Sequence, residues 1–479
     1  MSTLAVFVTL YLAASIAIGL YAARRVKTSG DYANAGRSLP LYIVIATVFA
    51  TWFGSETVLG IPAKFVKDGL GGVVEDPFGA SMCLVLVGLF FARKLYRMNL
   101  LTIGDYYRLR YSRTVEIIVS LCIVASYLGW VAAQITALGL VFNVLSQGAI
   151  GMAAGMCIGA GIVLVYTLFG GMWSVALTDL FQMSIIGVGL LYITWLVSGM
   201  AGGAQTVVAH AAAAGKFDFA PALGAKEILA FTGAIVTMMF GSIPQQDVFQ
   251  RVASSKDEMT AGRASVLGGL LYFCFAFIPM FLAYSATMID PKMVADLIEK
   301  DPQLILPTLI MTKVPLLAQI MFFGALLSAI KSCASATLLA PSVTFTENIL
   351  KGFLPPQTDK QFLFGMRCVV LVFTVLVTLF ALQTESSIYK MVENAYKVTL
   401  VAAFVPLAFG LYWTPATRQG ALAAITLGLT TWIGLELMAP EGFWPPQLAG
   451  VLASLLGMVA GSLLPQVIAP RESATPAAT

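Results

Sequence analysis

The sequence predicts an all-α protein that crosses a membrane many times, and three observations lead to this fold class. The chain of 479 residues is 59% hydrophobic and only 11% charged, whereas charged residues make up about a quarter of an ordinary soluble domain. The mean hydropathy is strongly positive, at +0.87. The chain also contains about thirteen apolar stretches near the twenty residues that a membrane-spanning helix needs. We therefore expect about thirteen transmembrane helices.

The basic residues predict how these helices are oriented. With the N-terminus outside, the cytoplasmic loops hold about 18 of the 28 Lys and Arg, which is the bias that the positive-inside rule describes. Arg24 and Arg25 follow the first apolar stretch, and Arg93, Lys94 and Arg97 follow the third. The expected topology places the N-terminus outside and the C-terminus inside, in the inner membrane of a cell.

The remaining composition narrows the class of protein. The net charge of +4 reports the loop bias, and no basic run or zinc spacing indicates a nucleic-acid partner. The six cysteines lie in or near apolar stretches, so a disulfide framework is not expected. The first stretch lacks the features of a signal peptide and is predicted to be a retained helix, and the tail after Gln466 is expected to be disordered. The expected partners are a small-molecule substrate and the lipid bilayer, with no obligatory protein partner inferred.

Two of the apolar segments are interrupted at matching depth, about halfway across. The segments cover residues 41–62 and 228–248, and each carries one Gly and one Pro at the interruption: Gly54 and Pro62 in the first, Gly241 and Pro244 in the second. A broken helix exposes backbone groups that cannot stay unpaired in hydrocarbon, so a break persists only where it is buried or lines a polar cavity. Two such breaks in corresponding halves of a chain are typical of a secondary transporter with its site at the midplane. No P-loop sequence is present to use ATP, so transport would run on an ion gradient.

Three of the charged residues inside the predicted spans are candidates for function. Lys331 lies between Lys313 and Glu347 with no other charge, and its ammonium would cost about 3 kcal/mol at a helix centre. One interpretation is that Lys331 forms a structural ion pair. The other is that its ammonium binds the substrate or takes the place of a bound ion. Glu56 and Asp179 are the acids that could pair with it, titrate with protons or attract a cation, although Asp179 could instead cap a helix at the interface.

Two tryptophans also lie in the spans, away from the interfacial belts where Trp usually gathers. Trp52 is in the first interrupted segment, and Trp130 is in the middle of the fourth stretch. Two indole faces in a polar cavity suit an organic cation. The alternative is that both rings pack in an apolar core.

Several motifs together resemble the sodium:solute symporter family. The most specific is GGMWSVALTDLFQ at residues 170–182, which is similar to the family signature GG-x-x-x-V-x-x-TD-x-x-Q. The segments LLTIGDYYRLRYSR, IPQQDVFQRVASSK and TFTENI follow in the family's order, so that the resemblance covers roughly residues 5–415.

The resemblance implies a leucine-transporter-type fold with two inverted five-helix repeats. The expected parts are a first helix and cytoplasmic loop at 1–39, repeat 1 at 40–201, an outer loop at 202–227, repeat 2 at 228–414, and two accessory helices with the tail at 415–479.

Within the family, the sequence is most similar to the choline-transporter branch. The matching segments are ATW at 50–52, DPFG, GLFFAR, GWVAAQITALG and IPQQDVFQR. The resemblance implies an aromatic cage for a quaternary ammonium, with Trp52 and Trp130 in two of its positions. Ala80 and Gln245 stand where the branch has a tyrosine and a tryptophan. We therefore expect an amine, an amino acid or a carboxylate as solute, bound by Trp52, Trp130, Gln245, the Gly54 break and Lys331.

The resemblance also implies a sodium site. Its ligands would be the backbone carbonyls of Ala50, Phe53 and Ala329 and the side chains of Ser332 and Cys333. Cys333 offers sulfur where the family has a hydroxyl, although a hard cation such as sodium prefers oxygen. Asp179 matches an acid that the family places along the cytoplasmic route of sodium.

The function expected from the sequence is sodium-coupled symport of a small organic solute by alternating access, and no catalytic constellation indicates an enzyme. Two alternatives remain. One is a proton-coupled or sodium-independent carrier in which Lys331 replaces the sodium ion and Glu56 or Asp179 titrates. The other is a transporter-like sensor that binds solute and signals to another protein.

Overall fold

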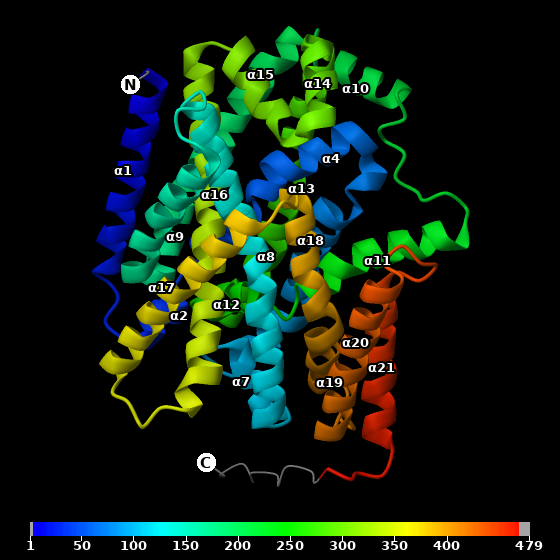
Figure 1. Cartoon of the computed structure of the whole chain (residues 1–479). Helices are drawn as coiled ribbons and strands as arrows, with labels where there is room; N and C mark the ends of the chain where they lie inside the picture. Colours follow the sequence, from blue (N-terminus) through cyan, green and yellow to red (C-terminus); the bar gives the residue numbers. More distant parts are fainter. Residues whose placement is uncertain (1–2, 469–479) are drawn as a thin grey trace.

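The structure is a computed structural model that describes residues 3–468, and these residues form helices joined by short connections (Figure 1). Among the described residues the β-type pairing is limited to one bridge, between Leu39 and Ser255. Short 3-10 or π-helical segments are labelled η. The part of the predicted tail beyond residue 468 lies outside the described residues.

In the first half of the chain the elements are α1 (Thr3–Ala23), α2 (Ser29–Asn34), η1 (Ala35–Arg37), α3 (Leu41–Trp52), η2 (Glu56–Gly60), α4 (Ile61–Asp68), η3 (Leu70–Gly72), η4 (Val74–Gly79), α5 (Ala80–Leu86), η5 (Val87–Phe91), α6 (Ala92–Arg97), α7 (Ile103–Arg110), α8 (Arg113–Leu145), α9 (Met152–Met200) and α10 (Ala204–Ala213). In the second half they are α11 (Ala225–Gly241), α12 (Gln246–Ser254), α13 (Glu258–Ile289), α14 (Pro291–Lys300), η6 (Pro302–Leu304), α15 (Ile305–Lys313), α16 (Leu316–Thr344), η7 (Phe345–Ile349), η8 (Leu350–Gly352), α17 (Asp359–Gln383), α18 (Ile388–Thr399), η9 (Leu400–Phe404), α19 (Val405–Tyr412), α20 (Arg418–Met438) and α21 (Pro446–Leu463).

Both interrupted segments are broken helices. The chain bends by 54° between α3 and the η2–α4 segment, and by 43° between α11 and α12. The first pair extends to Asp68 and the second to Ser254, so each is longer than the segment the sequence analysis outlined. Pro244 lies in the second break, where its missing N–H removes a helix hydrogen bond. Pro62 instead lies in the first turn of α4, where a proline is tolerated.

Helix α9 is a hairpin of two arms, because its 49 residues turn at Gly171. Gly171 has φ 47°, and a Cβ there would lie 2.4 Å from the Tyr32 carbonyl oxygen, so only glycine fits this turn. The first arm starts beside the outer part of α8, where Gly155 lies against Phe142. The second arm runs back along α16, where Gly189 lies against Met321. The second glycine of the GG signature therefore makes the turn between two antiparallel arms.

The helices are long and apolar enough for a multi-pass membrane protein. Ten described helices pass a length and hydropathy test for a membrane span, and each of the two bent pairs adds one. Dividing α9 at Gly171 gives the thirteen spans that the sequence predicts. Helix α1 begins at the upper end of the molecule and α21 ends at the lower end (Figure 1), as an odd number of crossings requires. The exact number of spans, their orientation and the division into two repeats remain predictions.

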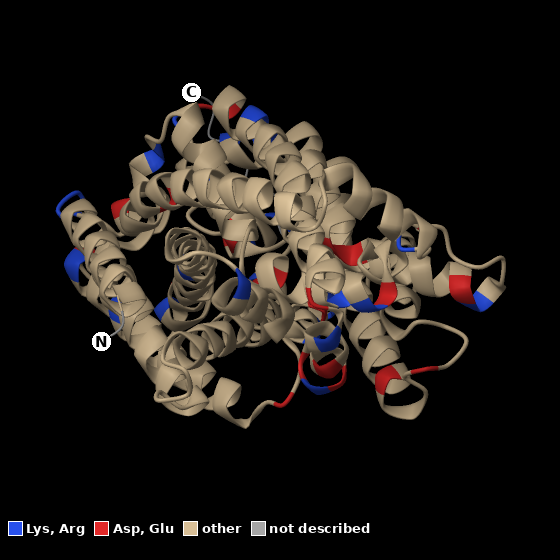
Figure 2. Ribbon diagram, turned by 90° about the horizontal axis from the view of Figure 1, so that it is seen from above, with Lys and Arg blue, Asp and Glu red and all other residues tan. Residues whose placement is uncertain are grey.

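The outer surface of the bundle is apolar, as contact with lipid requires. Most of the ribbon carries neither acidic nor basic residues (Figure 2). Large apolar side chains are exposed on the outward faces of the helices, among them Trp195 at 71%, Leu376 at 53% and Leu456 at 71%. An exposed apolar surface of this kind indicates a membrane.

Candidate functional site

The two helix breaks lie close together in the interior. The end of α3 leaves carbonyl groups beyond the last helical turn, and Phe53 has left helical geometry (φ −85°, ψ 73°). The Tyr396 ring packs against Trp52 at the first break, and a Cβ on Gly241, at the second break, would lie 2.5 Å from the Tyr396 carbonyl oxygen. Tyr396 therefore connects the two breaks.

Four aromatic side chains form one buried cluster around the first break. The Trp52 ring centroid lies 5.9 Å from that of Trp130, 6.5 Å from that of Tyr272 and 6.2 Å from that of Tyr396. The Trp130 and Tyr396 centroids are 5.4 Å apart, and none of the four residues is more than 3% exposed. We call these four residues the aromatic cluster. Its rings pack against one another in this structure.

Hydrogen-bonded polar groups border the aromatic cluster on one side. The Tyr272 hydroxyl donates to the buried Asp76 carboxylate. It also exchanges a hydrogen bond of 3.1 Å with the Thr57 hydroxyl. This chain of groups joins η4, α13 and the first break.

Gln245 is the residue directly before α12, and it lies beside the aromatic cluster. Its Nε2 donates to the hydroxyl of Ser126 at 3.0 Å and to that of Thr399 at 3.2 Å. Ser126 lies one turn from Trp130 on α8, and Thr399 lies one turn from Tyr396 on α18. The amide of Gln245 is therefore held beside two members of the cluster.

Asp179 lies between the first broken helix and α16. Its Oδ2 accepts from the Thr47 hydroxyl at 2.5 Å, and its Oδ1 accepts from the Ser332 hydroxyl at 2.5 Å. Asp179 is fully buried within the second arm of α9. The helix-cap alternative for Asp179 is therefore wrong, because the residue lies inside a helix and not at its end.

Glu56 folds back over the first break. A Cβ built on Gly54 would lie 2.7 and 2.9 Å from the two Glu56 carboxylate oxygens, and 2.8 Å from the Cys333 sulfur. The Gln134 Nε2 donates to Glu56 Oε2 at 2.7 Å. Gly54, Glu56 and Cys333 thus meet at one point of the break.

Lys331 faces away from the aromatic cluster. Its Nζ lies 5.1 Å from the ring centroid of Tyr11 on α1 and 5.7 Å from that of Tyr166 on the first arm of α9. The residue is 1% exposed, and no hydrogen-bond partner for its Nζ is found among the described residues. The two tyrosine faces compensate part of the cost of burying the ammonium. The structure therefore does not bring Lys331 together with the other predicted solute-binding residues, and we do not include it in the solute site.

Acids outnumber bases around the two breaks. Glu56, Asp76 and Asp247 are all buried there, and Tyr127 donates a hydrogen bond to Asp247. The nearby base is Arg251, whose NH2 group donates to the Thr51 hydroxyl at 2.8 Å and whose NH1 group donates to the Asp247 carbonyl at 3.2 Å. This surplus of carboxylates favours cationic ligands.

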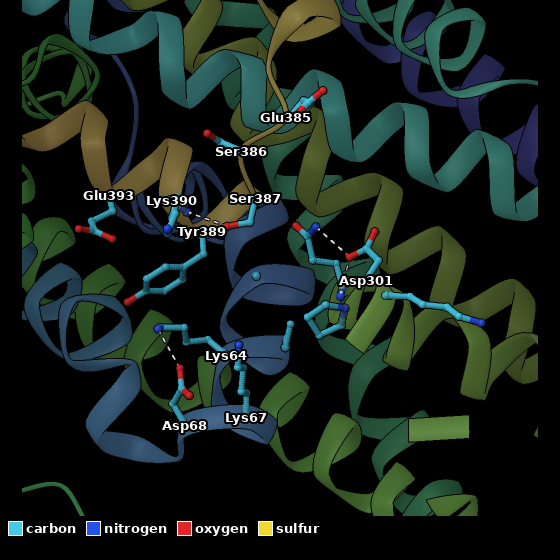
Figure 3. A pocket seen from close by; sticks show the side chains of 15 residues that line it. Lys64, Lys67, Asp68, Asp301, Glu385, Ser386, Ser387, Tyr389, Lys390 and Glu393 are labelled. Carbon is cyan, nitrogen blue, oxygen red and sulfur yellow. Dashed lines mark hydrogen bonds and ion pairs between the residues drawn. The ribbon is translucent and has the colours of Figure 1, made fainter. Parts of the chain in front are cut away.

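A polar cavity lies at the upper end of α4 and α18 (Figure 3). Its volume is about 480 Å³, and its lining includes Lys64, Asp68, Tyr389 and Glu393. At its floor, a Cβ on Gly60 would lie 3.4 Å from the backbone nitrogen of Tyr389. Tyr389 lies two helical turns before Tyr396 on α18, so this cavity lies about two turns of α18 away from the aromatic cluster.

The sequence analysis missed several residues of this region. Tyr396, Tyr272, Asp76 and Gln134 were not singled out, because each meets the other residues of the site only through packing between distant segments. Asp247 lies in the quoted motif IPQQDVFQR but was given no role. An acid in the middle of a broken span was the one available signal.

Comparisons with known proteins identify the family. The sodium:solute symporter family matches residues 32–428. High-affinity choline transporter 1 of Caenorhabditis elegans is 27% identical over 86% of this chain and 74% of its own length, which confirms the predicted similarity to the choline-transporter branch. The sodium/pantothenate symporter of Escherichia coli is also 27% identical, over 95% of this chain and 96% of its own length.

Solved structures establish the fold. A sodium-coupled sialic acid symporter in its substrate-bound, outward-open state aligns with a TM-score of 0.82 at 20% identity, covering 96% of this chain and 97% of that one. Mhp1, a nucleobase-cation-symport-1 family transporter, aligns with a TM-score of 0.59 at 15% identity over 90% of this chain and 94% of its own. The predicted leucine-transporter-type fold is confirmed. The chain belongs to the sodium:solute symporter family, and it is a multi-pass membrane protein that couples the movement of a small solute to sodium and is not an enzyme.

Proposed function

We propose that the protein transports a small organic amine with sodium and that the aromatic cluster is the solute site. The observation that carries this proposal is the packing of four aromatic rings around the first break, in an interior where carboxylates outnumber bases. Each aromatic face attracts a cation by about 0.5–2 kcal/mol. A carboxylate solute would instead face Glu56, Asp76 and Asp247, which share its charge.

The departures from the cage of the choline-transporter branch bear on which amine is bound. Ala80 and Gln245 remove two rings from that cage, but Tyr272 and Tyr396 supply two others. Gln245 adds an amide, which its hydrogen bonds to Ser126 and Thr399 hold beside the cluster. The site therefore suits an amine that also carries a hydrogen-bonding group, and choline is itself such a solute.

The proposed sodium site lies beside the first break. The carbonyls of Ala50 and Phe53 belong to the end of α3, where the helix no longer uses them. The carbonyl of Ala329 and the side chains of Ser332 and Cys333 come from α16, and the Ser332 hydroxyl already contacts Asp179. This donor set is rich in oxygen, as sodium requires, except at Cys333.

The location of Lys331 counts against the alternative in which its ammonium replaces sodium. Its Nζ lies between Tyr11 and Tyr166 and does not face the end of α3. Asp179 is held by two hydroxyls and has no ammonium or guanidinium partner among the ion pairs of residues 3–468. A sodium ion from solution therefore suits the region around Asp179 better than the Lys331 ammonium does.

We propose that the cavity of Figure 3 is the outer entrance and that the Gly60–Tyr389 contact must separate for solute to enter. Closure of this kind isolates a bound ligand from water in many proteins that move between open and closed states. We further propose that the membrane is the inner membrane of a cell.

Flux into liposomes that contain only this chain tests the proposal. We expect solute uptake that requires a sodium gradient, with a solute identified beforehand by thermal stabilisation against a panel of amines, amino acids and carboxylates. Stabilisation by carboxylates alone would contradict the amine assignment. Equal uptake in sodium and potassium would contradict sodium coupling, and binding without flux would support the sensor alternative.

A further inference from the structure

Cys333 leaves the proposed sodium site one hard ligand short. Sodium is a hard cation and prefers oxygen, whereas a thiol is a soft donor. The neighbouring Ser332 hydroxyl donates its hydrogen to Asp179 but keeps its oxygen lone pairs for an ion, so it is the one side-chain oxygen among the expected ligands. A sodium site built only from the ligands expected from the family resemblance would therefore bind the ion weakly at the Cys333 position.

Glu56 brings an oxygen ligand to the position of this sulfur. Both carboxylate oxygens and the Cys333 sulfur lie within 2.9 Å of the point where a Gly54 Cβ would be. The carboxylate therefore lies on the end of the first broken helix, next to Cys333, and not in the outer cavity. Glycine at position 54 is what allows this approach, because any side chain would displace one group or the other.

The Glu56 carboxylate is held in place by neutral groups. Gln134 accepts from the Ser55 backbone N–H at 2.9 Å through Oε1 and donates to Glu56 Oε2 at 2.7 Å. The Ser55 hydroxyl lies 3.4 Å from the same Oε2. The hydrogen bonds from these two side chains fall on Oε2, and both carboxylate oxygens lie within 2.9 Å of the point where a Gly54 Cβ would be.

No described base neutralises Glu56. The residue is 3% exposed and appears in none of the ion pairs of the described chain. Lys331 is turned toward α1, and Arg251 is bonded to Thr51 and to the Asp247 carbonyl. A buried carboxylate without a counter-charge is costly, so this group is well suited to receive a cation.

We propose that Glu56 is a sodium ligand that replaces the hydroxyl missing at Cys333. The ion would then be held by the carbonyls at the end of α3, the Ser332 hydroxyl and the Glu56 carboxylate. This inference rests on the proposed sodium site. It adds to that site an anionic ligand whose charge balances that of the ion.

The test is sodium-dependent thermal stabilisation of the purified full chain with no organic solute present. Sodium chloride is titrated against potassium chloride at constant ionic strength for the wild type, Glu56→Gln, Cys333→Ser and the double variant. We expect Glu56→Gln to raise the half-maximal sodium concentration about tenfold or more, which corresponds to about 1.4 kcal/mol. In the Cys333→Ser background, Glu56→Gln should raise the half-maximal sodium concentration by a factor at least threefold smaller, because the serine hydroxyl completes the site.

Asp76→Asn is the matched control. It removes another buried acid near the aromatic cluster but keeps an oxygen that accepts from Tyr272. We expect its sodium titration to stay within about threefold of the wild type. If Asp76→Asn shifts the sodium titration as much as Glu56→Gln does, the effect comes from losing any interior negative charge, and the proposal is overturned.

The remaining outcomes separate this inference from the proposed function. If sodium does not stabilise the wild type, the sodium site fails and the role of Glu56 fails with it. If sodium stabilises the wild type and Glu56→Gln equally, only the role of Glu56 is overturned, and a loss confined to the solute response would assign Glu56 to the solute. If Glu56→Gln does not fold, Glu56→Asp takes its place. This variant keeps the charge but shortens the side chain, and it should weaken sodium binding in the wild-type background more than in the Cys333→Ser background.

Discussion

The Tyr396 hydroxyl gives the sharpest test of the solute site. Tyr396 is fully buried, and within the part of the chain that the structure describes its hydroxyl has no hydrogen-bond partner. A buried polar group left without a partner costs about 1–3 kcal/mol. Such a cost is reasonable where a ligand will later supply the partner. We therefore predict that Tyr396→Phe stabilises the solute-free protein and weakens solute binding.

The expected magnitudes follow from the same hydrogen bond. Removing the unpartnered hydroxyl should stabilise the solute-free state by up to about 1–3 kcal/mol, and losing a neutral hydrogen bond to solute should cost about 0.5–1.5 kcal/mol. Because the wild-type hydroxyl gains a partner only when solute binds, the loss of affinity is the sum of the two figures, at least about 1.5 kcal/mol, or a rise in the solute Kd of about 13-fold or more. The ring faces toward Trp52 and Trp130 are retained in Tyr396→Phe, so binding should weaken without being lost.

The assay is a melting temperature with and without solute, together with solute uptake. Tyr127→Phe is the control, because Tyr127 stacks on Trp130 at 5.9 Å but its hydroxyl is already bonded to Asp247. That variant should destabilise the solute-free protein. The reasoning is refuted if Tyr396→Phe lowers the solute-free melting temperature as Tyr127→Phe does, or if it leaves the solute Kd unchanged.

Three further predictions follow from other parts of the structure. Asp179→Asn should raise the sodium concentration for half-maximal uptake about tenfold or more, since it removes the charge that Thr47 and Ser332 hold in place; an unchanged sodium dependence would contradict this. Lys331→Met should keep sodium-dependent uptake within about threefold of the wild type, because a buried charge is replaced by an apolar chain of similar length between the same two rings; loss of uptake in this variant would show that the ammonium acts at the ion site. Gly171→Ala should lower the melting temperature or prevent accumulation, since a positive φ costs about 1–3 kcal/mol and the added Cβ meets the Tyr32 carbonyl; a stable, active variant would contradict the hairpin of α9.

The sequence predicted the fold well because the signals are local and repeated. Each span is a run of apolar residues, and each break carries a helix-breaking residue, Gly54 in the first and Pro244 in the second. Gly171 was quoted as part of a motif, but the turn it makes depends on the approach of Tyr32 from another helix. No pattern within one segment contains that information.

The site was harder to predict because its parts come from distant segments. Trp52 and Trp130 stood out by residue type, and the structure brings them together. Tyr396 and Tyr272 look like ordinary aromatic residues of a span until packing places them beside Trp52. The unusual charge of Lys331 is visible in the sequence, but the rotation about α16 that places its Nζ beside Tyr11 and Tyr166 is not.

The first broken helix connects the two proposed sites, and this predicts how sodium and solute act on each other. Trp52 supplies a ring to the aromatic cluster, while Ala50 and Phe53, on either side of it, supply carbonyls to the sodium site. An ion that fixes these carbonyls therefore also fixes the Trp52 ring. We expect sodium to raise the solute affinity by about 5- to 150-fold, and solute to raise the sodium affinity by the same factor, because coupling between two binding sites is reciprocal. Titrations of each ligand with and without the other measure both factors, and a factor of one would mean that the two ligands do not share this helix end.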